Sequence, residues 1–211
     1  RKLANIVRNH FKSKAVVLMY HRIDSPASDI WDIAVSPATF EQQLKVLKNN
    51  YTVLSVEELI QSLKKKTLKK KCIAITFDDG CLDNFTIAKP LLEKYHLPAT
   101  FFVPSGFVDG QKAFWWNVIE DVFLHAPKLP KHLSIEIDGT QYDFHLENEA
   151  ELTAEIVNQH KNWKANDSLP PTLRADCYFK IWQKLRILPP QAIDDVMSRI
   201  ESWANYNSKE N

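Results

Sequence analysis

Residues 76–80, with the sequence TFDDG, constrain the fold of this protein more than any other stretch. They follow residues 72–75, a short, partly β-branched apolar run of the kind that forms a strand buried on both faces. Asp78 and Asp79 therefore stand where a core strand ends. Gly80 permits a sharp turn that brings both carboxylates to the carboxyl end of the strand, and ligands bind at that end in parallel α/β folds.

Two adjacent carboxylates at the mouth of an apolar sheet repel each other and lose hydration. A cation, hydrogen bonds or a shared proton must compensate them, which makes the pair a candidate catalytic or metal-binding site. An ordinary polar turn after a strand is the alternative explanation of Asp-Asp-Gly, and the tripeptide alone does not separate the two.

Length and charge limit the possible classes of protein. With 211 residues, 45% of them hydrophobic, the protein is able to bury a substantial core, so we expect one domain or one domain with an insertion. The formal net charge of +1 creates no overall field that favours nucleic acid or an anionic membrane. Residues 64–71 contain six lysines but no aromatic residue, and we interpret them as a solvated loop.

The cysteines and the first residues bear on localisation. Cys72, Cys81 and Cys177 cannot all pair and form no CxxC motif, which favours a reducing compartment. Residues 1–14 are basic and amphipathic without a long apolar run, unlike a signal peptide or a membrane span. We interpret them as a solvated first helix, with binding to a membrane surface as the alternative. The expected location is cytoplasmic, or peripheral at the inner membrane.

Strands and helices alternate up to residue 106. Besides the strand before Asp78, apolar runs predict strands at residues 15–20, 51–54 and 99–103. The alternation implies a parallel sheet with right-handed crossovers. Tyr20-His21 would then end the first strand at the same edge as the carboxylates, where His21 either lines a site or is simply a hydrogen-bonded residue at a strand end.

Three helices connect these strands. The first is predicted to begin at Ser36-Pro37, with serine as N-cap and proline at the first helical position. The second begins at Ser55, which forms a capping box with Glu58. The third covers residues 83–95, and Pro90 predicts a kink in it.

The pattern changes after Gly106. Phe114-Trp115-Trp116 leads into a helix, and a hairpin follows around Asp138-Gly139. We interpret the aromatic residues of the remaining helices as core rather than as a cofactor site. The expected hairpin strands and the later helices lie at residues 133–137, 140–146, 148–164, 172–187 and 190–205. The expected division is 1–106 for the α/β part and 107–211 for a mainly helical insertion.

Taken together, these stretches resemble the polysaccharide deacetylases with NodB-homology domains, which are similar to carbohydrate esterase family 4. The resemblance runs from residue 15 to 106 and extends weakly to Trp115-Trp116. It rests on residues 17–23, 36–47, 51–59, 76–80 with 83–84, and 99–103. It implies an α/β fold, here a partial (β/α) barrel, and a hydrolase that uses a divalent metal, zinc in the first instance, to remove acetyl groups from a polysaccharide or glycan precursor.

The resemblance also implies roles for individual residues. The first aspartate of the family motif is the general base and the second is a metal ligand, which places these roles on Asp78 and Asp79. A carboxylate beside a metal-bound water accepts its proton, and a backbone N–H near Gly80 or Cys81 would help to hold the oxyanion. Tyr20 and His21 are expected to line this site.

The later motifs of that family have no counterpart here. They supply two histidine ligands about one helical turn apart, an arginine that orients the base and a histidine that acts as general acid. Cys81 also replaces the aromatic residue that usually follows the first motif. No two histidines of this sequence have the required spacing; they are His10, His21, His96, His125, His132, His145 and His160.

A catalytic zinc normally uses three protein ligands, and Asp79 is the one convincing candidate. Four strands cannot close a barrel either, and an open edge favours self-association. We therefore expect the amino-terminal portion of a deacetylase domain with its insertion, incomplete and inactive alone, its histidine ligands not present. Two alternatives stay open: a non-catalytic remnant or carbohydrate-binding module of this fold, and one half of a split enzyme.

Overall fold

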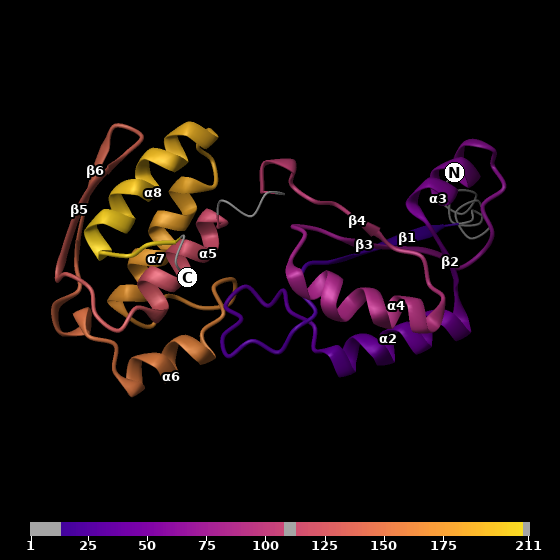
Figure 1. Ribbon diagram of the computed structural model, residues 1–211, viewed down its shortest axis with the longest axis horizontal. Coiled ribbons are helices and arrows are strands. Elements are labelled where there is room, and N and C mark those ends of the chain that lie inside the picture. The colour runs from indigo at the N-terminus through magenta and orange to yellow at the C-terminus, as the bar shows by residue number, and fades with distance from the viewer. Residues whose placement is uncertain (1–13, 108–112, 209–211) are drawn as a thin grey trace, which may run out of the picture. The chain divides into compact units, whose positions relative to one another are not determined.

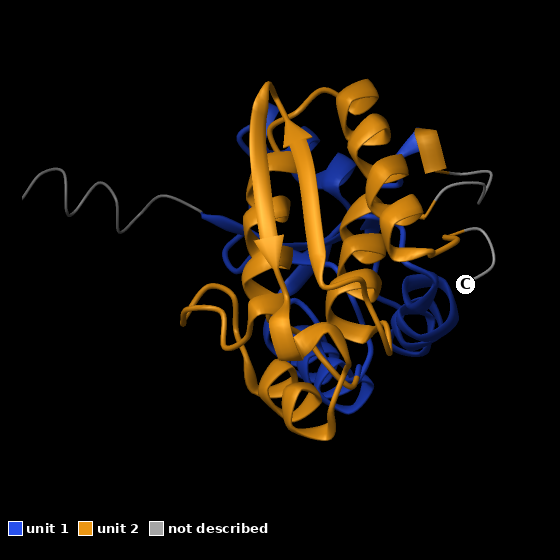
Figure 2. Ribbon diagram, turned by 90° about the vertical axis from the view of Figure 1, so that its left-hand side faces the viewer, with its two compact units in different colours: residues 1–26, 33–105 blue, residues 27–32, 106–211 orange. Residues whose placement is uncertain are grey.

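The computed structural model describes residues 14–107 and 113–208. Most of the basic stretch expected to form a first helix, residues 1–13, lies outside them, as does His10. The protein divides into two compact units, coloured separately in Figure 2. Unit 1 comprises residues 1–26 and 33–105, and unit 2 comprises residues 27–32 and 106–211.

Residues 27–32 belong to unit 2 although they lie far from the rest of it in the sequence. The indole Nε1 of Trp31 donates to the hydroxyl of Tyr178 at 2.8 Å, and the C=O of Ile30 accepts from the N–H of Ala165 at 2.8 Å. These long-range bonds have no local sequence signal, so the sequence pattern does not predict that residues 27–32 belong to unit 2.

Unit 1 contains a parallel sheet built around β3 (Cys72–Phe77), as Figure 1 shows. One edge of β3 pairs with β1 (Ala15–Tyr20) over its whole length. Its other edge pairs first with β2 (Thr52–Leu54) and then with β4 (Thr100–Phe101). Every residue of β3 is buried, so the predicted core strand and the parallel α/β architecture are confirmed.

Strand β1 is not the buried strand that its sequence predicts. The exposed fractions of Val16, Val17 and Met19 are 52%, 55% and 62%. The reason is that β1 pairs only with β3 within the described residues, and its other edge carries no strand there. The expectation for residues 99–103 was also too long, since β4 has two residues and Phe102 and Val103 are exposed beyond it.

The helices α2 (Pro37–Asn50) and α3 (Val56–Lys64) begin where the sequence predicts. Ser36 caps α2 by accepting from the N–H of Thr39, and Ser55 with Glu58 forms the expected capping box. α2 then buries Phe40, Leu44 and Leu47 against the face of the sheet that carries Ile73, Ile75 and Phe77. Figure 1 shows that α4 lies beside α2 on this face.

The predicted helix over residues 83–95 is instead two elements, a π-helical turn η1 (Asn84–Ala88) and the helix α4 (Lys89–Tyr95). The wide turn closes with a bond from the N–H of Lys89 to the C=O of Asn84. Pro90, which has no N–H to donate, follows directly in the first turn of α4. The structure thus has a π-helical turn before the proline, where the sequence predicted a kink at it.

Unit 2 contains a β-hairpin and helices. The strands β5 (His132–Ile137) and β6 (Thr140–His145) pair in antiparallel fashion. Asp138 and Gly139 between them have φ of 51° and 69°, as the predicted two-residue turn requires. The other elements are α5 (Trp115–Glu120), η3 (Asp121–His125), η4 (Glu147–Ala150), α6 (Ala154–Asn162), α7 (Leu173–Leu185) and α8 (Pro190–Ala204).

The predicted helix at residues 148–164 is shorter in the structure. A short 3₁₀ turn, η4, comes first, and α6 begins only after Thr153, whose hydroxyl accepts from the N–H of Ile156. The interpretation of the aromatic residues as core is confirmed for Trp163, which is 3% exposed.

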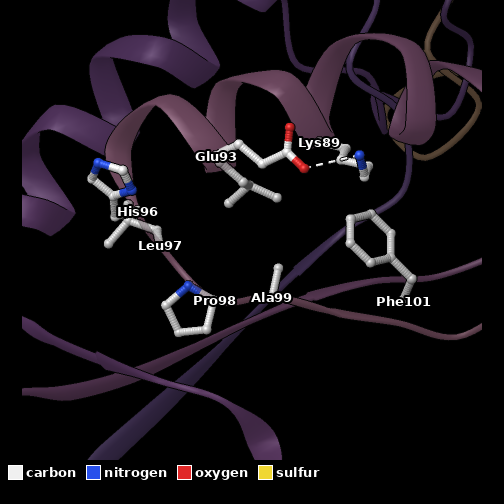
Figure 3. A pocket seen from close by; sticks show the side chains of 8 residues that line it. Lys89, Glu93, His96, Leu97, Pro98, Ala99 and Phe101 are labelled. Carbon is white, nitrogen blue, oxygen red and sulfur yellow. Dashed lines mark ion pairs between the residues drawn. The ribbon is translucent and has the colours of Figure 1, made fainter.

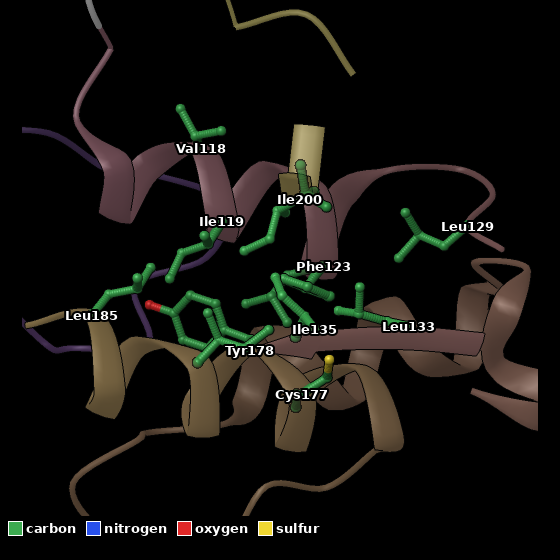
Figure 4. Close-up of a cluster of buried hydrophobic side chains, with 14 of the residues drawn as sticks. Val118, Ile119, Phe123, Leu129, Leu133, Ile135, Cys177, Tyr178, Leu185 and Ile200 are labelled. Carbon is green, nitrogen blue, oxygen red and sulfur yellow. The ribbon is translucent and has the colours of Figure 1, made fainter. Parts of the chain in front are cut away.

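The core of unit 2 forms where α5, η3, the hairpin, α7 and α8 meet (Figure 4). Ile119, Phe123, Tyr178 and Ile200 are among its fully buried members. None of the helices among the described residues is long and apolar enough to cross a membrane.

Candidate functional site

The carboxyl ends of β1 and β3 lie side by side in the unit 1 sheet. Tyr20 pairs with Phe77 in the parallel register, and the N–H of Asp78 donates to the C=O of Tyr20 at 2.9 Å. His21 and Asp78 are the next residues along the two strands. The structure therefore brings His21 to the same edge as the carboxylate pair.

The turn after β3 begins one residue earlier than the sequence suggests. Asp79 already has a left-handed backbone, with φ of 69°, and Gly80 follows with φ of 64°. A residue with a side group adopts this conformation rarely, although aspartate tolerates it better than most. Both Asp78 and Asp79 are partly exposed at this turn.

Gly80 is required for two reasons. Its positive φ disfavours any residue with a Cβ, and a Cβ built there would lie 3.0 Å from Cγ1 of Val103. The residue that follows the carboxylate pair thus packs against the segment that follows β4.

We predict that Gly80→Ala destabilises the protein by about 1–2 kcal/mol through its backbone conformation alone, and that contact with Val103 adds to this loss. Gly106→Ala is the matched control, because a Cβ at Gly106 meets nothing within 4 Å and its φ is not positive. Urea unfolding followed by far-UV circular dichroism measures both. Equal stability of the two variants would contradict the role assigned to Gly80.

The side chain of Tyr20 does not reach this edge. Its ring stacks on Phe77, with centroids 5.4 Å apart, and meets Phe40 edge-on at 5.2 Å. Its hydroxyl donates to Oε1 of Gln43 on α2 at 2.9 Å. Tyr20 was expected to line the site, but it contributes its backbone C=O there, while its ring belongs to the core.

A polar network that sequence analysis did not assign to the site lies next to the turn. The carboxylate of Asp83 accepts from the N–H of Ile23 at 2.8 Å and from Nε of Arg22 at 3.2 Å. The amide of Asn84 donates to the C=O of His21 at 2.9 Å and to Oδ1 of Asp83 at 2.9 Å. The signal available in the sequence was the pair of polar residues Asp83-Asn84 at the expected helix start. The structure shows that Asp83 makes no capping bond there.

Cys81 follows the turn and is half-buried. Burial raises the pKa of its thiol, and the carboxylates of Asp83 and Asp79 raise it further, while Arg22 acts in the opposite direction. The thiol is therefore protonated at neutral pH, which argues against Cys81 as a nucleophile.

The carboxylate pair does not by itself complete a metal centre. Within residues 14–107 and 113–208, no three His, Cys, Asp or Glu residues are grouped so that they could hold a metal ion. A catalytic zinc takes three protein ligands. Asp79 can offer one carboxylate, so the described residues do not fit a complete zinc site.

A separate hollow of about 630 Å³ lies between α4 and β4 (Figure 3). Its polar groups include the ion pair between Lys89 and Glu93, with 2.9 Å between Nζ and Oε1. The residues that line it are Lys89, Leu92, Glu93, His96, Leu97, Pro98, Ala99 and Phe101. It includes none of the site residues predicted from the sequence, and the strand edge with Asp78 and Asp79 remains the candidate site.

Comparisons with known proteins agree on one family. Residues 65–133, which contain the Asp-Asp-Gly turn, match the family model described as polysaccharide deacetylase. A putative polysaccharide deacetylase, YxkH, from Bacillus subtilis is 37% identical over 137 residues, which cover 63% of this chain and 48% of that protein. A poly-beta-1,6-N-acetyl-D-glucosamine N-deacetylase from Staphylococcus aureus is 32% identical over 116 residues, covering 49% of this chain and 40% of that protein.

Among solved structures, IcaB from Ammonifex degensii matches with 32% sequence identity and a TM-score of 0.43, covering 53% of this chain and 49% of that one. The present chain spans about half the length, or less, of the curated relatives that it matches.

Proposed function

The chain belongs to the polysaccharide deacetylase family, and from this we propose that the protein is a hydrolase that removes acetyl groups from a polysaccharide or glycan precursor. The observation that carries the proposal is the Asp78-Asp79-Gly80 turn at the carboxyl end of the buried strand β3. The name of the Staphylococcus aureus relative supports an N-acetylated hexosamine polymer as the first substrate to test.

The proposed reaction uses Asp78 as general base. Its carboxylate accepts a proton from a water molecule whose oxygen attacks the carbonyl carbon of the acetyl group. The bond from that carbon to the sugar nitrogen or oxygen then breaks, so that acetate and a free amine or hydroxyl are released. A backbone N–H near Gly80 or Cys81 is proposed to stabilise the oxyanion of the tetrahedral intermediate.

The leaving group needs a proton, and the general-acid histidine of the later family motifs has no counterpart in this sequence. His21, which is expected to line the site, is proposed for this step instead. His21 follows β1 at the edge where Asp78 follows β3. His96 is the other described histidine of unit 1, but it lies at the end of α4, just before β4 begins. Because β4 runs parallel to β3, His96 lies toward the amino-terminal ends of the strands, away from Asp78. Histidine is the side chain that most often acts as a general acid in enzymes, which supports this assignment.

Asp79 is proposed as one ligand of a divalent metal, zinc in the first instance. Such an ion would polarise the acetyl carbonyl and lower the pKa of a bound water. The histidine ligands of the family have no counterpart in this sequence, and within the described residues no three-ligand group forms. We therefore expect the 211 residues alone to be inactive.

The test compares these 211 residues with the product of the complete reading frame. Acetate release from acetylated chito-oligosaccharides and from poly-β-1,6-N-acetylglucosamine is measured together with metal content by mass spectrometry. Metal and acetate release in the longer protein, with neither in the 211-residue protein, is the expected result. Absence of both from the longer protein would overturn the assignment and leave the fold as a binding module or a remnant.

A further inference from the structure

Three consecutive residues that follow β1 are each bound by one of two neighbouring side chains, Asp83 or Asn84. The C=O of His21 accepts from the amide of Asn84, and the N–H of Ile23 donates to Asp83. Between them, Nε of Arg22 donates to the second carboxylate oxygen of Asp83. These five residues join segments about 60 positions apart in the sequence, and we call Asp83 and Asn84 with these bonds the clamp.

The side chains of Asp83 and Asn84 are buried, so their hydrogen-bond geometry is tightly constrained. Asp83 is 9% exposed, Asn84 is 2% exposed, and Ile23 is fully buried. A buried carboxylate or amide that loses its partners keeps the cost of desolvation without compensation. Because Nδ2 of Asn84 donates to two oxygens, the orientation of its amide is determined by these contacts.

One atom of the clamp has no partner among the described residues. Oδ1 of Asn84 is buried and accepts no hydrogen bond there. Most buried polar atoms have a hydrogen-bond partner. For Asn84 the fold supplies partners on the donor side of the amide, namely the C=O of His21 and the carboxylate of Asp83.

The clamp also closes a loop around the carboxylate pair. At the start of the loop, the N–H of Asp78 binds the C=O of Tyr20. At its end, Asp83 and Asn84 bind the three residues that follow Tyr20. The left-handed residues Asp79 and Gly80 lie between these two attachments, so the loop that carries them is held at both ends.

We propose that Asp83 and Asn84 are positioning residues that hold His21 and the Asp78-Asp79 turn at a constant separation for deacetylation. The proposal rests on the proposed function. Displacing a reacting group by about 1 Å can cost on the order of 100-fold in rate, so loss of the clamp acts on turnover more than on substrate binding.

Two substitutions, one at Asp83 and one at Asn84, test the bonds of the clamp separately. Asp83→Asn keeps an oxygen for the N–H of Ile23 but turns an amide donor toward Arg22, which is also a donor. Asn84→Ala removes the bond to His21. Asp24→Asn is the matched control, because Asp24 is the other carboxylate that binds Arg22. Asp24 accepts from Nη2 of Arg22, whereas Asp83 accepts from Nε.

The kcat and KM of acetate release by the complete protein are measured, with hydrogen exchange of peptides that cover residues 20–24 and 77–85. We expect kcat to fall about 10- to 100-fold in Asp83→Asn and Asn84→Ala, with KM within about 2-fold. Exchange rises in these two segments but not in α2. Asp24→Asn retains the kcat and the exchange of the unsubstituted protein.

The positioning role is refuted if hydrogen exchange in these segments is unchanged in Asp83→Asn and Asn84→Ala. It is also refuted if exchange rises while kcat stays within about 3-fold of the unsubstituted protein. A purely structural role would lower the folded fraction and raise exchange throughout unit 1, including α2, which also contradicts the proposal. No acetate release by the unsubstituted protein would instead refute the proposed function and, with it, the catalytic role of the clamp. Exchange alone would still show whether the two segments are held together.

Discussion

Asp78→Asn lowers the kcat of acetate release by the complete protein by about 10²- to 10⁴-fold, the usual contribution of a general base. Asparagine has nearly the same shape and keeps the backbone N–H that binds the C=O of Tyr20. Its amide cannot take a proton from water at neutral pH. The fold of unit 1 should therefore survive while the proton-transfer step is lost.

Asp79→Asn gives the complementary result. Asparagine also tolerates the left-handed backbone of this position, where φ is 69°. We expect this variant to lose bound metal together with activity, whereas Asp78→Asn retains its metal. Metal content by mass spectrometry distinguishes the two, and equal retention in both would show that the roles are assigned to the wrong residues.

Asp138→Asn is the control for both substitutions. Asp138 is an exposed aspartate with φ of 51° in the hairpin turn of unit 2, so the same chemical change is made on a similar backbone away from the strand edge. Its kcat should match that of the unsubstituted protein. An Asp78→Asn variant that retains activity within about 3-fold would exclude Asp78 as general base.

Arg174→Met lowers the free energy of unfolding of unit 2 by at least about 1–3 kcal/mol, the cost of leaving one buried acceptor without its donor. Arg174 is fully buried at the start of α7, and its guanidinium donates to four backbone C=O groups. The acceptors belong to Phe123, Ala126, Glu149 and Ala150. Methionine fills much of the volume but leaves these carbonyls without their donor.

Tryptophan fluorescence during urea unfolding measures this loss in unit 2 alone, because all six tryptophans lie in that unit. Lys180→Met on the same helix is the control, since the Lys180 side chain is 55% exposed and forms a surface ion pair with Asp176. It should change stability by less than about 1 kcal/mol. An equal loss in both variants would contradict the role given to the Arg174 guanidinium.

The elements that sequence predicted well depend on neighbours a few residues away. The caps at Ser36 and Ser55 require only the next helical turn, and the hairpin turn requires only Asp138 and Gly139. The buried strand β3 follows from its own run of apolar residues. Local chemistry was also enough to place Asp78 and Asp79 at a strand end.

Other features depend on partners that the sequence does not place. The exposure of β1 follows from its having one paired edge among the described residues, which its apolar sequence cannot reveal. The inward turn of the Tyr20 ring follows from its contacts with Phe40 and Phe77. The burial of Arg174 follows from carbonyls supplied by η3 and η4.

The sequence by itself thus determined the strand that ends in two carboxylates, the parallel α/β pattern of unit 1 and the likeness to polysaccharide deacetylases. The position of His21 beside the carboxylates was also predicted, and the pairing of β1 with β3 confirms it. The tertiary structure alone decided that Asp83 and Asn84 bind the residues that follow β1. The reason is physical: a cap or turn is a contact within a few residues, whereas the clamp joins groups about 60 residues apart that meet only when β1 and β3 pair.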